Sequence, residues 1–483
     1  MKRTMTLVLA LLLLLASCGG GTETETTAET AVQTETAAVE TELTDNLPER
    51  DYGGADYVIL AAAEQWQNTY AAEESTGDVL NDAVFHRNTA VEERFGVGLQ
   101  YEVVNGYTAG TAIVTDKLRG SVQAGDAVYD LMTASSAYTA PYITGGLLQN
   151  MTKMEYLDFD APWYFHETNA NLTVDGKLYI AAGSFGFNTI DQCGALFFNK
   201  ELMDDLGEEY PYQTVLDGKW TYDKMLALAE KAAMDLDGDG ATTGADRFGL
   251  LSTEYESLQW LAYGMGYLIT VPDADGLPSL VGATETNVNI LDQLSLLKNN
   301  KEAYYQCKVA PADEMIPMFA AGQTLFAAYC LKLAPYEEMR NAPDFGIIPM
   351  PKLEEGQKMY YSKAFVDVAA FPMVLKDAEM SQIVLEGLQS SSHFDVLPAY
   401  YDVVLQRKLT RDEDSAAMID LIREGIICDF GMAFFSVLSA ELFQIEPLIR
   451  NGSFSTWWAG QEKGLNTKLD NLLETLATLD TEG

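Results

Sequence analysis

The chain has 483 residues and carries 72 acidic against 30 basic side chains, which gives a formal net charge of −42 at pH 7. A field of that sign repels nucleic acid and anionic membrane surfaces, so the composition excludes DNA and RNA as partners. Hydrophobic residues make up 48% of the chain. This share of apolar residues is enough to form a large hydrophobic core, and the length predicts two or more domains.

The first residues predict export. Lys2 and Arg3 precede an apolar run from Leu7 to Ala16, which ends in Ser17 and Cys18. That order is typical of a secretory signal peptide, and the run is shorter than the about 20 apolar residues of a membrane span. Small residues before a cysteine resemble the lipobox of bacterial lipoproteins, which implies a signal peptide over 1–17 and a lipid on Cys18. The alternative is ordinary signal cleavage beside an incidental cysteine.

Residues 18–50 are dominated by Thr, Glu and Ala, as in the run from Thr22 to Thr27. Such a segment buries too little apolar surface to offset its ordering entropy, so we expect a disordered tether. A tether between a lipid and a folded body predicts an extracytoplasmic protein that is anchored to the cell membrane through the lipid alone.

From Tyr57 onward, short apolar runs alternate with longer amphipathic stretches, which predicts an α/β fold. The expected strands are 57–61, 98–104, 129–134, 178–183, 194–198, 325–330, 345–349 and a strand-rich run over 364–374. The expected helices are 79–95, 112–124, 200–206, 222–234, 284–297, 313–321 and most of the tail from residue 415, with Thr221 as an N-cap. Strands that end in Ser and Gly loops, as at Ser135-Ser136, are where open α/β sheets bind ligands.

The cysteines and histidines do not predict a catalytic metal. After Cys18 the chain has four cysteines at long, irregular spacings, without a C-x-x-C pair: Cys193, Cys307, Cys330 and Cys428. We expect small buried thiols, since a chain of this length does not need disulfides. Three histidines that lie far apart argue against a catalytic zinc site.

One acidic loop matches a calcium-binding pattern. Aspartates stand at loop positions 1, 3 and 5, glycine at 6 and a carboxylate at 12, so the expected ligands are Asp235, Asp237, Asp239, Asp246 and the carbonyl of Ala241. The departure is Asp246, where the template has the longer Glu. A structural Ca²⁺ is expected, and the alternative is an ordinary acidic loop in an acidic protein.

Several short motifs, in the same order along the chain, resemble family 1 extracellular solute-binding proteins, the sugar-type substrate-binding lipoproteins of ABC transporters. They are 195–202 (ALFFNKEL), 220–223 (WTYD), 246–249 (DRFG), 319–322 (FAAG), 344–351 (DFGIIPMP), 397–401 (LPAYY), 411–413 (RDE) and 418–420 (MID). The resemblance runs from about residue 55 to the end. It implies a type II periplasmic-binding fold, with two α/β lobes joined by a multi-segment hinge. Lobe 1 would comprise 51–192 and 360–400, and lobe 2 would comprise 193–359 and 401–483.

Polar and aromatic residues at the predicted strand ends are the candidate ligand-binding residues, because sugars need rings to stack on and polar groups for their hydroxyls. They are Trp66, Ser135, Ser136, Tyr138, Asn188, Asp191, Tyr329 and Trp457. The order of the family's motifs places Trp66, Tyr329 and Trp457 near aromatic positions of its ligand cleft. For each aromatic residue, core packing is the alternative. Trp163, Trp220, Trp260 and the stretch from Met315 to Met318 are expected in the core.

The resemblance implies that the chain captures a small solute in a cleft between its lobes and delivers it to the permease subunits of an ABC importer. The expected solute is a mono- or oligosaccharide, with polyamines, peptides and metal chelates as alternatives. No catalysis is expected and no cofactor is required. The chain lacks a nucleophile elbow and a phosphate-binding glycine loop, which favours a binding protein. The alternatives are a lipid-anchored glycosidase or lyase, for which one pair of carboxylates suffices, and a surface sensor or adhesin.

Overall fold

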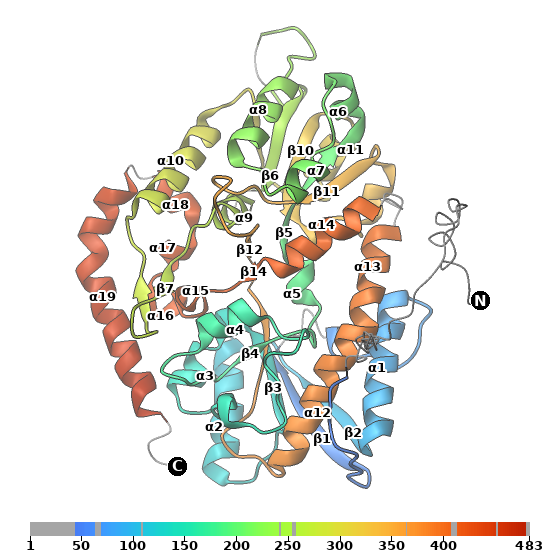
Figure 1. Cartoon of the computed structure of the whole chain (residues 1–483), viewed down its shortest axis with the longest axis vertical. Helices are drawn as coiled ribbons and strands as arrows, with labels where there is room; N and C mark the ends of the chain where they lie inside the picture. Colours follow the sequence, from blue (N-terminus) through green and yellow to red (C-terminus); the bar gives the residue numbers. More distant parts are fainter. Residues whose placement is uncertain are drawn as a thin grey trace, which may run out of the picture. The chain divides into compact units, whose positions relative to one another are not determined.

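The computed structural model describes residues 44–62, 69–107, 110–240, 243–253, 257–363, 365–406, 413–450 and 453–479 (Figure 1). Residues 45–483 form one compact unit. The predicted signal peptide, Cys18 and most of the tether lie outside the described residues, as do Trp66 and Ala241. Among the helices of the described ranges, none has the length and apolar character that a membrane crossing requires.

The first sheet has the strand order β2-β1-β3-β13-β4. Its strands are β1 (Ala55–Ala62), β2 (Val97–Val103), β3 (Leu131–Ser135), β4 (Ala181–Ala182) and β13 (Asp367–Ala370). β1 is parallel to β2 and to β3, whereas β13 runs antiparallel to both β3 and β4. β3 is buried along its whole length, as expected for a strand with packed layers on both faces.

Helix α1 (Val79–Phe95) shows how local sequence signals set the boundaries of an element. Asp78 caps its N-terminus by accepting hydrogen bonds from the backbone N–H groups of Leu80 and Asn81. Gly96 ends it in the left-handed conformation, with φ of 61°. The helix packs on α12 (Ala378–Ser391), which lies beside it in Figure 1.

The second sheet has the strand order β11-β5-β10-β6-β9. Its strands are β5 (Gly194–Asn199), β6 (Phe248–Thr253), β9 (Tyr304–Cys307), β10 (Thr324–Cys330) and β11 (Phe345–Pro349). β5 is antiparallel to its two neighbours, while β10, β6 and β9 are mutually parallel. β5 is buried throughout, so the near-continuous apolar run over 194–198 reflects a central strand.

The remaining helices cover the two sheets and the region between them (Figure 1). Those before residue 260 are α2 (Thr111–Ala124), α3 (Ala140–Thr144), α4 (His166–Leu172), α5 (Asn188–Asp191), α6 (Lys200–Leu206), α7 (Tyr212–Leu216) and α8 (Tyr222–Ala232), with α9 (Ser257–Gly264) following β6. The later ones are α10 (Glu285–Asn299), α11 (Met315–Ala320), α13 (Leu397–Gln406), α14 (Glu413–Glu424), α15 (Phe430–Ala433), α16 (Phe435–Leu438), α17 (Ala440–Phe443), α18 (Ile445–Arg450) and α19 (Phe454–Thr478).

Within the described residues, three segments lead from one sheet to the other. The first contains α5 and connects β4 to β5. The second leads from β11 to β13 and contains β12 (Ser362–Lys363), which pairs with β14 (Ile426–Ile427). The third runs from α12 through the π-helical turn Ser392–Val396 into α13 and on to α14, which packs on β11. A hairpin of β7 (Thr270–Pro272) and β8 (Pro278–Leu280) forms a separate two-stranded sheet that contacts α15.

Most predicted elements are present, and the differences have local causes. The strand predicted over 178–183 shortens to β4, which pairs with β13 only at Ala181 and Ala182, and the run over 364–374 contains β13; next to these strands, Gly183 and Pro372 form isolated bridges to Tyr164 and Leu148. Thr221 precedes α8 as predicted, but its side chain makes no capping hydrogen bond. The residues that each lobe comprises stay a prediction.

The end of the predicted tether belongs to the folded unit. Asp45 forms an ion pair with Arg94 at 2.5 Å and accepts a hydrogen bond from Ser390, and Leu47 packs against the core. Arg50 pairs with Glu379 at the start of α12. The folded body therefore begins near Asp45, and the prediction of disorder is wrong for residues 45–50.

Candidate functional site

Polar groups collect at one edge of the first sheet. β1 and β3 end there, at Ala62 and Ser135, and the antiparallel β13 begins there at Asp367. Asp367 and Ser135 are direct partners in the β13–β3 register, and the backbone N–H of Ser136 donates to the carbonyl of Val366 at 2.8 Å. Carboxyl ends of parallel strands are the usual ligand-binding edge of open α/β sheets.

The second sheet presents a matching edge. β10 ends in Tyr329 and Cys330, which pair with Ala195 and Gly194 at the start of β5, and β6 ends at Thr253 on the same side. Only residues 183–193 separate β4 from β5, so this short crossing segment joins the two edges directly. The candidate site consists of these two edges and the crossing segments between them.

The structure brings five of the predicted ligand residues to the first edge and the crossing segment beside it. Ser135 and Ser136 are buried, and the Ser136 hydroxyl lies 3.7 Å from the sulfur of Cys428. Tyr138 is half-buried. Asn188 and Asp191 lie on α5. Whether these residues bind a ligand stays a prediction.

The other predicted residues are placed differently. Trp66 lies outside the described residues. Tyr329 lies at the second edge, where its ring meets that of Trp260 edge-on at 5.3 Å. Trp457 lies on α19, and its indole N–H donates to Glu441 of α17 at 2.9 Å. This bond connects α19 to α17.

Several residues of the site were missed by the sequence analysis. Three half-buried phenylalanines form a cluster beside the second crossing segment, since Phe365 lies 4.5 Å from Phe443 and 5.8 Å from Phe435 between ring centroids. Tyr107 lies 4.8 Å from Tyr138 and completes an aromatic pair past the ends of β2 and β3. Tyr107 follows a predicted strand and could have been found by that signal, whereas Phe365 was hidden inside a run predicted as strand.

Asp367, at the first edge, was also missed by the sequence analysis. Its pKa is raised further than that of the neighbouring Asp191. Asp367 is 4% exposed and accepts a hydrogen bond from the Asn188 side-chain amide at 3.2 Å. Burial raises the pKa of Asp367 to about 7, and the nearby charge of Asp191 adds to the increase, although the bond from Asn188 opposes it. Burial likewise raises the pKa of Asp191 to about 6.

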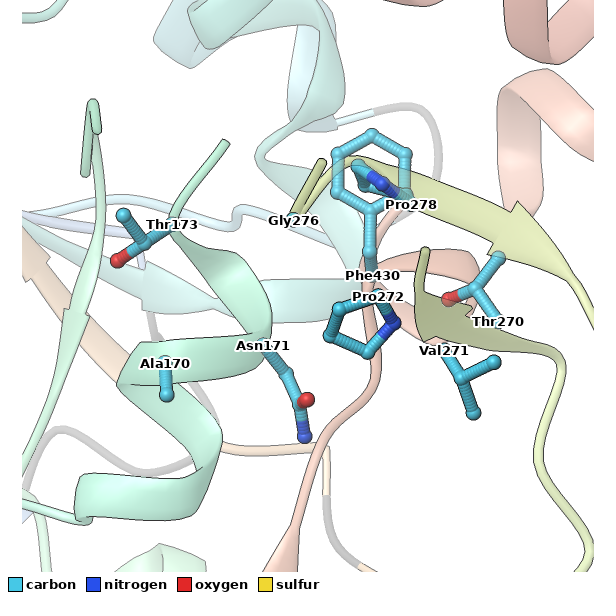
Figure 2. Close-up of a pocket in the computed structure, with 9 residues that line it drawn as sticks. All are labelled: Ala170, Asn171, Thr173, Thr270, Val271, Pro272, Gly276, Pro278 and Phe430. Atoms are coloured by element: carbon cyan, nitrogen blue, oxygen red, sulfur yellow. The ribbon is translucent and has the colours of Figure 1, made fainter. Parts of the chain in front are cut away.

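A small pocket lies between α4 and the β7–β8 hairpin. Figure 2 shows the α4 residues on one side and the hairpin on the other, with Phe430 between them. Its cavity volume is about 10 Å³, room for about one water molecule and far below the about 300–1,000 Å³ of typical ligand pockets. The pocket therefore reflects imperfect packing between the hairpin and α4 better than it fits a solute site.

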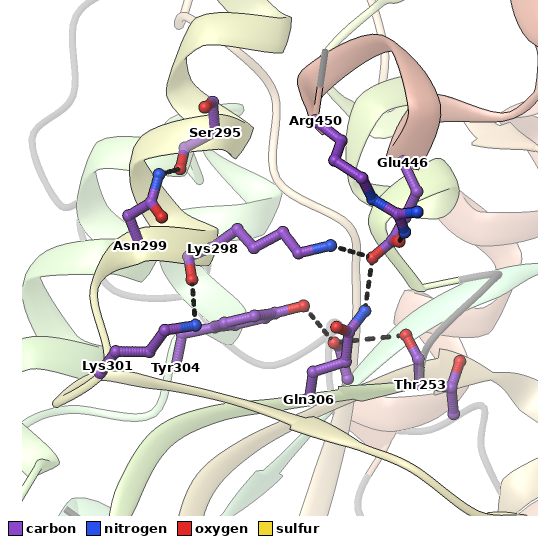
Figure 3. Close-up of polar contacts among 10 residues, drawn as sticks. Thr253, Ser295, Lys298, Asn299, Lys301, Tyr304, Gln306, Glu446 and Arg450 are labelled. Atoms are coloured by element: carbon purple, nitrogen blue, oxygen red, sulfur yellow. Dashed lines mark hydrogen bonds and ion pairs between the residues drawn. The ribbon is translucent and has the colours of Figure 1, made fainter. Parts of the chain in front are cut away.

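An ion-pair network around the buried Glu446 braces the second sheet. Glu446 is 7% exposed and accepts hydrogen bonds from Lys298, from Gln306 at 2.6 Å and from Arg450 at 2.7 Å (Figure 3). Burial alone would raise the pKa of Glu446, but the donors outweigh burial and lower it. Since Gln306 lies on β9, next to the end of β6, the network fixes the helix α18 against this edge of the sheet.

The acidic loop brings three carboxylates together. Oxygens of Asp235, Asp237 and Asp239 lie within 4.8 Å of one another, and all three residues are exposed. Asp246 lies outside this group, and its two oxygens accept the backbone N–H groups of Leu236 and Thr243 at 3.0 and 2.7 Å. The oxygen donors suit calcium, which stays a prediction.

The residues expected in the core are buried. Trp163, Trp220 and Trp260 are 1%, 1% and 2% exposed, and Met315 and Met318 are also buried. The four cysteines of the described ranges are buried as well, as predicted for small thiols. These predictions are confirmed.

The chain has two sheets, each covered by helices, and crossing segments that join them. This is the type II periplasmic-binding fold, and comparison with solved structures confirms this fold class. M. tuberculosis UspC is similar, with a TM-score of 0.56 and 17% identity, over 86% of this chain and 100% of that one. A cyclo/maltodextrin-binding protein complexed with maltotetraose has a TM-score of 0.54 and 14% identity, over 89% and 98% of the two chains.

UgpB from Mycobacterium tuberculosis, in complex with glycerophosphocholine, has a TM-score of 0.52 and 14% identity, over 87% of this chain and 99% of that one. No protein-family model and no curated protein sequence matches the chain. At these identities the similarity establishes the fold alone.

Proposed function

We propose that the chain is an extracellular solute-binding protein of an ABC importer, which captures a small solute between the two sheets and delivers it to a membrane permease. The arrangement of the crossing segments is the observation that carries the proposal. The first two crossing segments leave directly from the two strand edges, so a hinge motion in them would bring polar groups of both edges onto one solute. A solute that contacts both edges only in the closed form would shift the population toward that form.

The proposed solute is a carbohydrate. The half-buried rings of Tyr107 and Tyr138 lie past the strand ends of the first edge, and the polar residues Ser135 and Asn188 lie at that edge and on the crossing segment. Sugars need this combination, because their C–H faces stack on rings while their hydroxyls need hydrogen-bond partners. Two of the similar structures hold maltotetraose and glycerophosphocholine, both small polar molecules rich in oxygen. A role as glycosidase or lyase gains no support from these binding proteins.

The proposed location is the outer face of the cell membrane, through a lipid on Cys18. The order of a basic start, a short apolar run and a cysteine after small residues supports it. Metabolic labelling with a radioactive fatty acid should mark the full-length chain and not its Cys18→Ser variant. Label on both would overturn the anchor.

The binding proposal is tested with the chain after residue 17, carrying Cys18→Ser. A thermal-shift screen covers mono- and oligosaccharides, glycerophosphodiesters and polyamines, and each hit is recovered and analysed by chromatography. A ligand at 100 times its Kd stabilises the protein by about 2.7 kcal/mol. An intact oligosaccharide supports the proposal. A cleaved one would make the chain an enzyme, and a screen with polyamine hits alone would overturn the carbohydrate class.

A further inference from the structure

Helix α5 is only four residues long, and its three polar side chains bond to two residues of the other crossing segments, Asp367 and Tyr400. The Asn188 amide donates to Asp367 Oδ1 at 3.2 Å, and Thr189 Oγ1 accepts the backbone N–H of Asp367 at 2.7 Å. Asp191 Oδ1 accepts the Tyr400 hydroxyl at 3.0 Å. Since Asp367 ends the second crossing and Tyr400 lies on α13 in the third, α5 ties all three crossings together.

These contacts are shielded from water. Asn188, Thr189, Asp367 and Tyr400 are between 0% and 4% exposed. Buried polar groups are costly unless their partners are in place, so these three bonds favour this arrangement of the crossing segments, in which Asn188 Oδ1 and Asp367 Oδ2 make no hydrogen bond within the described residues. Apolar side chains could fill the same space in several orientations, because they form no directional hydrogen bonds. The use of polar side chains here therefore indicates that the crossing segments are held in one relative position.

The tied segments also hold the two edges of the candidate site. On one side, Asp367 pairs with Ser135, and the Ser136 N–H bonds to Val366. On the other side, the carbonyl of Cys193, just past α5, accepts the Leu331 N–H at 3.0 Å, next to the Gly194–Cys330 pair. A shift of α5 against either neighbour would thus move a strand edge that carries candidate ligand residues.

We propose that α5 and its two partner residues form a clasp, made of Asn188, Thr189 and Asp191 on α5 together with Asp367 and Tyr400. This clasp holds the three crossing segments in the arrangement that ligand binding requires. Thr189, Asp367 and Tyr400 are then positioning residues, which set ligand affinity without touching the ligand. This inference rests on the proposed binding function and adds to it the residues that control it.

The charged groups around the clasp give it a pH dependence. Asp367 faces Asp191 on α5 and the hydroxyl of Tyr70, which in turn lies near the buried guanidinium of Arg87 on α1. Asp191 faces Tyr400 and the ammonium group of Lys332, and the thiols Cys193 and Cys330 lie around Tyr400. Ionised carboxylates are the better acceptors for Asn188 and Tyr400. We therefore expect affinity for a neutral sugar to fall as the pH drops through about 7 and then 6, the pKa values of Asp367 and Asp191.

Two pairs of variants separate positioning from general stability. Tyr400→Phe removes a clasp bond, and Tyr57→Phe removes the equally buried bond from the Tyr57 hydroxyl to the Ser381 carbonyl at 2.9 Å, in the first turn of α12, at the opposite end of that helix from the third crossing. Thr189→Val removes the second clasp bond, with Thr115→Val in α2 as its control. All four should lower Tm. Only the clasp variants should weaken ligand binding, by about 3- to 10-fold, as for the loss of one buried hydrogen bond.

A readout without ligand keeps this inference separate from the proposed function. Spin labels on Arg119→Cys in α2 and Lys231→Cys in α8 report the distance between these two helices, one on the side of each sheet. Both side chains are about half exposed, and the four cysteines of the described ranges are buried, so labelling is confined to the two introduced cysteines. Pulsed electron paramagnetic resonance of the ligand-free protein should show a broader distribution, extended to longer distances, in the clasp variants only.

The outcomes are distinct. A wild-type protein that binds no solute in the screen would overturn the proposed function, while the label distances would still test the clasp. Unchanged distances and affinity within about twofold of wild type in both clasp variants, with a lowered Tm, would show that the contacts only stabilise the fold.

Tyr400→Phe also tests the pH dependence of the clasp. It removes a bond that lowers the pKa of Asp191, so the pH midpoint of binding should move upward, and an unmoved midpoint would contradict the role of Asp191.

Discussion

The indole N–H of Trp163 donates to the carboxylate of Glu386 at 2.8 Å, and the neighbouring Tyr164 hydroxyl donates to the other oxygen of that carboxylate at 2.7 Å. Glu386 is 1% exposed on α12. Burial raises the pKa of Glu386 to about 7, although the bonds from Tyr164 and Trp163 oppose the increase. The folded protein therefore keeps this proton at pH values where the unfolded chain has lost it.

This linkage predicts that stability falls as the pH rises. Between about pH 4.5 and 7 the folded state binds more protons at Glu386 than the unfolded state, so the free energy of unfolding decreases through that window. Glu386→Gln removes the titration and keeps an uncharged side chain of the same size. Its stability relative to wild type should rise by up to about 3 kcal/mol between pH 4.5 and 8. Urea unfolding at several pH values measures it, with the exposed Glu93→Gln as control. Parallel pH profiles of wild type and Glu386→Gln would contradict the prediction.

A second prediction concerns Gly194 at the start of β5. A Cβ atom at this position would lie 2.5 Å from Cγ of the buried Trp260, so Gly194→Ala forces the indole to move. Overpacking of this kind costs about 1–3 kcal/mol. Because Trp260 also supports Tyr329 at the second edge, solute affinity should fall as well.

The matched control is Gly120→Ala in α2, where nothing lies within 4 Å of the added carbon. It should stabilise the protein by about 0.5–1 kcal/mol, because alanine is the better helix former. Thermal unfolding of both variants tests the pair. If Gly194→Ala has the same Tm as wild type, the Trp260 indole can move aside without loss of stability, and the prediction is wrong.

The sequence predicts the fold well where local signals set the boundaries. The limits of α1 agree with the prediction because Asp78 and Gly96 act through contacts within a few residues. Strand pairing was less visible. The order β2-β1-β3-β13-β4 places a strand from residue 367 between strands from residues 131 and 181, and nothing in the local pattern of β13 specifies those neighbours.

The candidate site was predicted only in part for the same reason. Ser135 and Ser136 follow a strand directly, so the ligand edge could be located from the sequence. Asp367 acquires its role from Asn188, which lies 179 residues away along the chain, and no spacing rule connects the two. Phe435 and Phe443 are part of a helical tail, where aromatic residues usually indicate packing.

A third prediction concerns the aromatic pair of Tyr107 and Tyr138. Both rings are half-buried past the strand ends of the first edge, where a sugar ring could stack on them. Tyr138→Ala should lower solute affinity about tenfold, which corresponds to the loss of one stacking contact. The control is Tyr156→Ala, a half-buried tyrosine near the start of α12, whose backbone N–H bonds to Gln382. Titration calorimetry with the solute found in the screen measures both, and an equal loss of affinity in the two variants would argue against a local contact.

The last prediction is calcium binding by the acidic loop. Asp235, Asp237 and Asp239 repel one another at close range, and a divalent cation with oxygen ligands would relieve that repulsion. Asp235 already accepts the N–H groups of Gly238 and Gly240 at 2.6 and 2.9 Å, which holds the loop in a turn around the carboxylates. Little reorganisation of the backbone is then needed for the ion to bind.

Calcium at 100 times its Kd should therefore stabilise the protein by about 2.7 kcal/mol, and Asp237→Asn or Asp239→Asn should abolish the effect. Asp275→Asn is the matched control, because Asp275 is an exposed aspartate in the turn of the β7–β8 hairpin, whose N–H bonds to Asp273. Thermal unfolding with calcium, with magnesium and with a chelator measures the shift. A shift of the same size in Asp237→Asn as in wild type, or an equal response to magnesium, would indicate weak screening of an acidic surface, because a site with several carboxylate ligands selects calcium over the smaller, more rigidly hydrated ion.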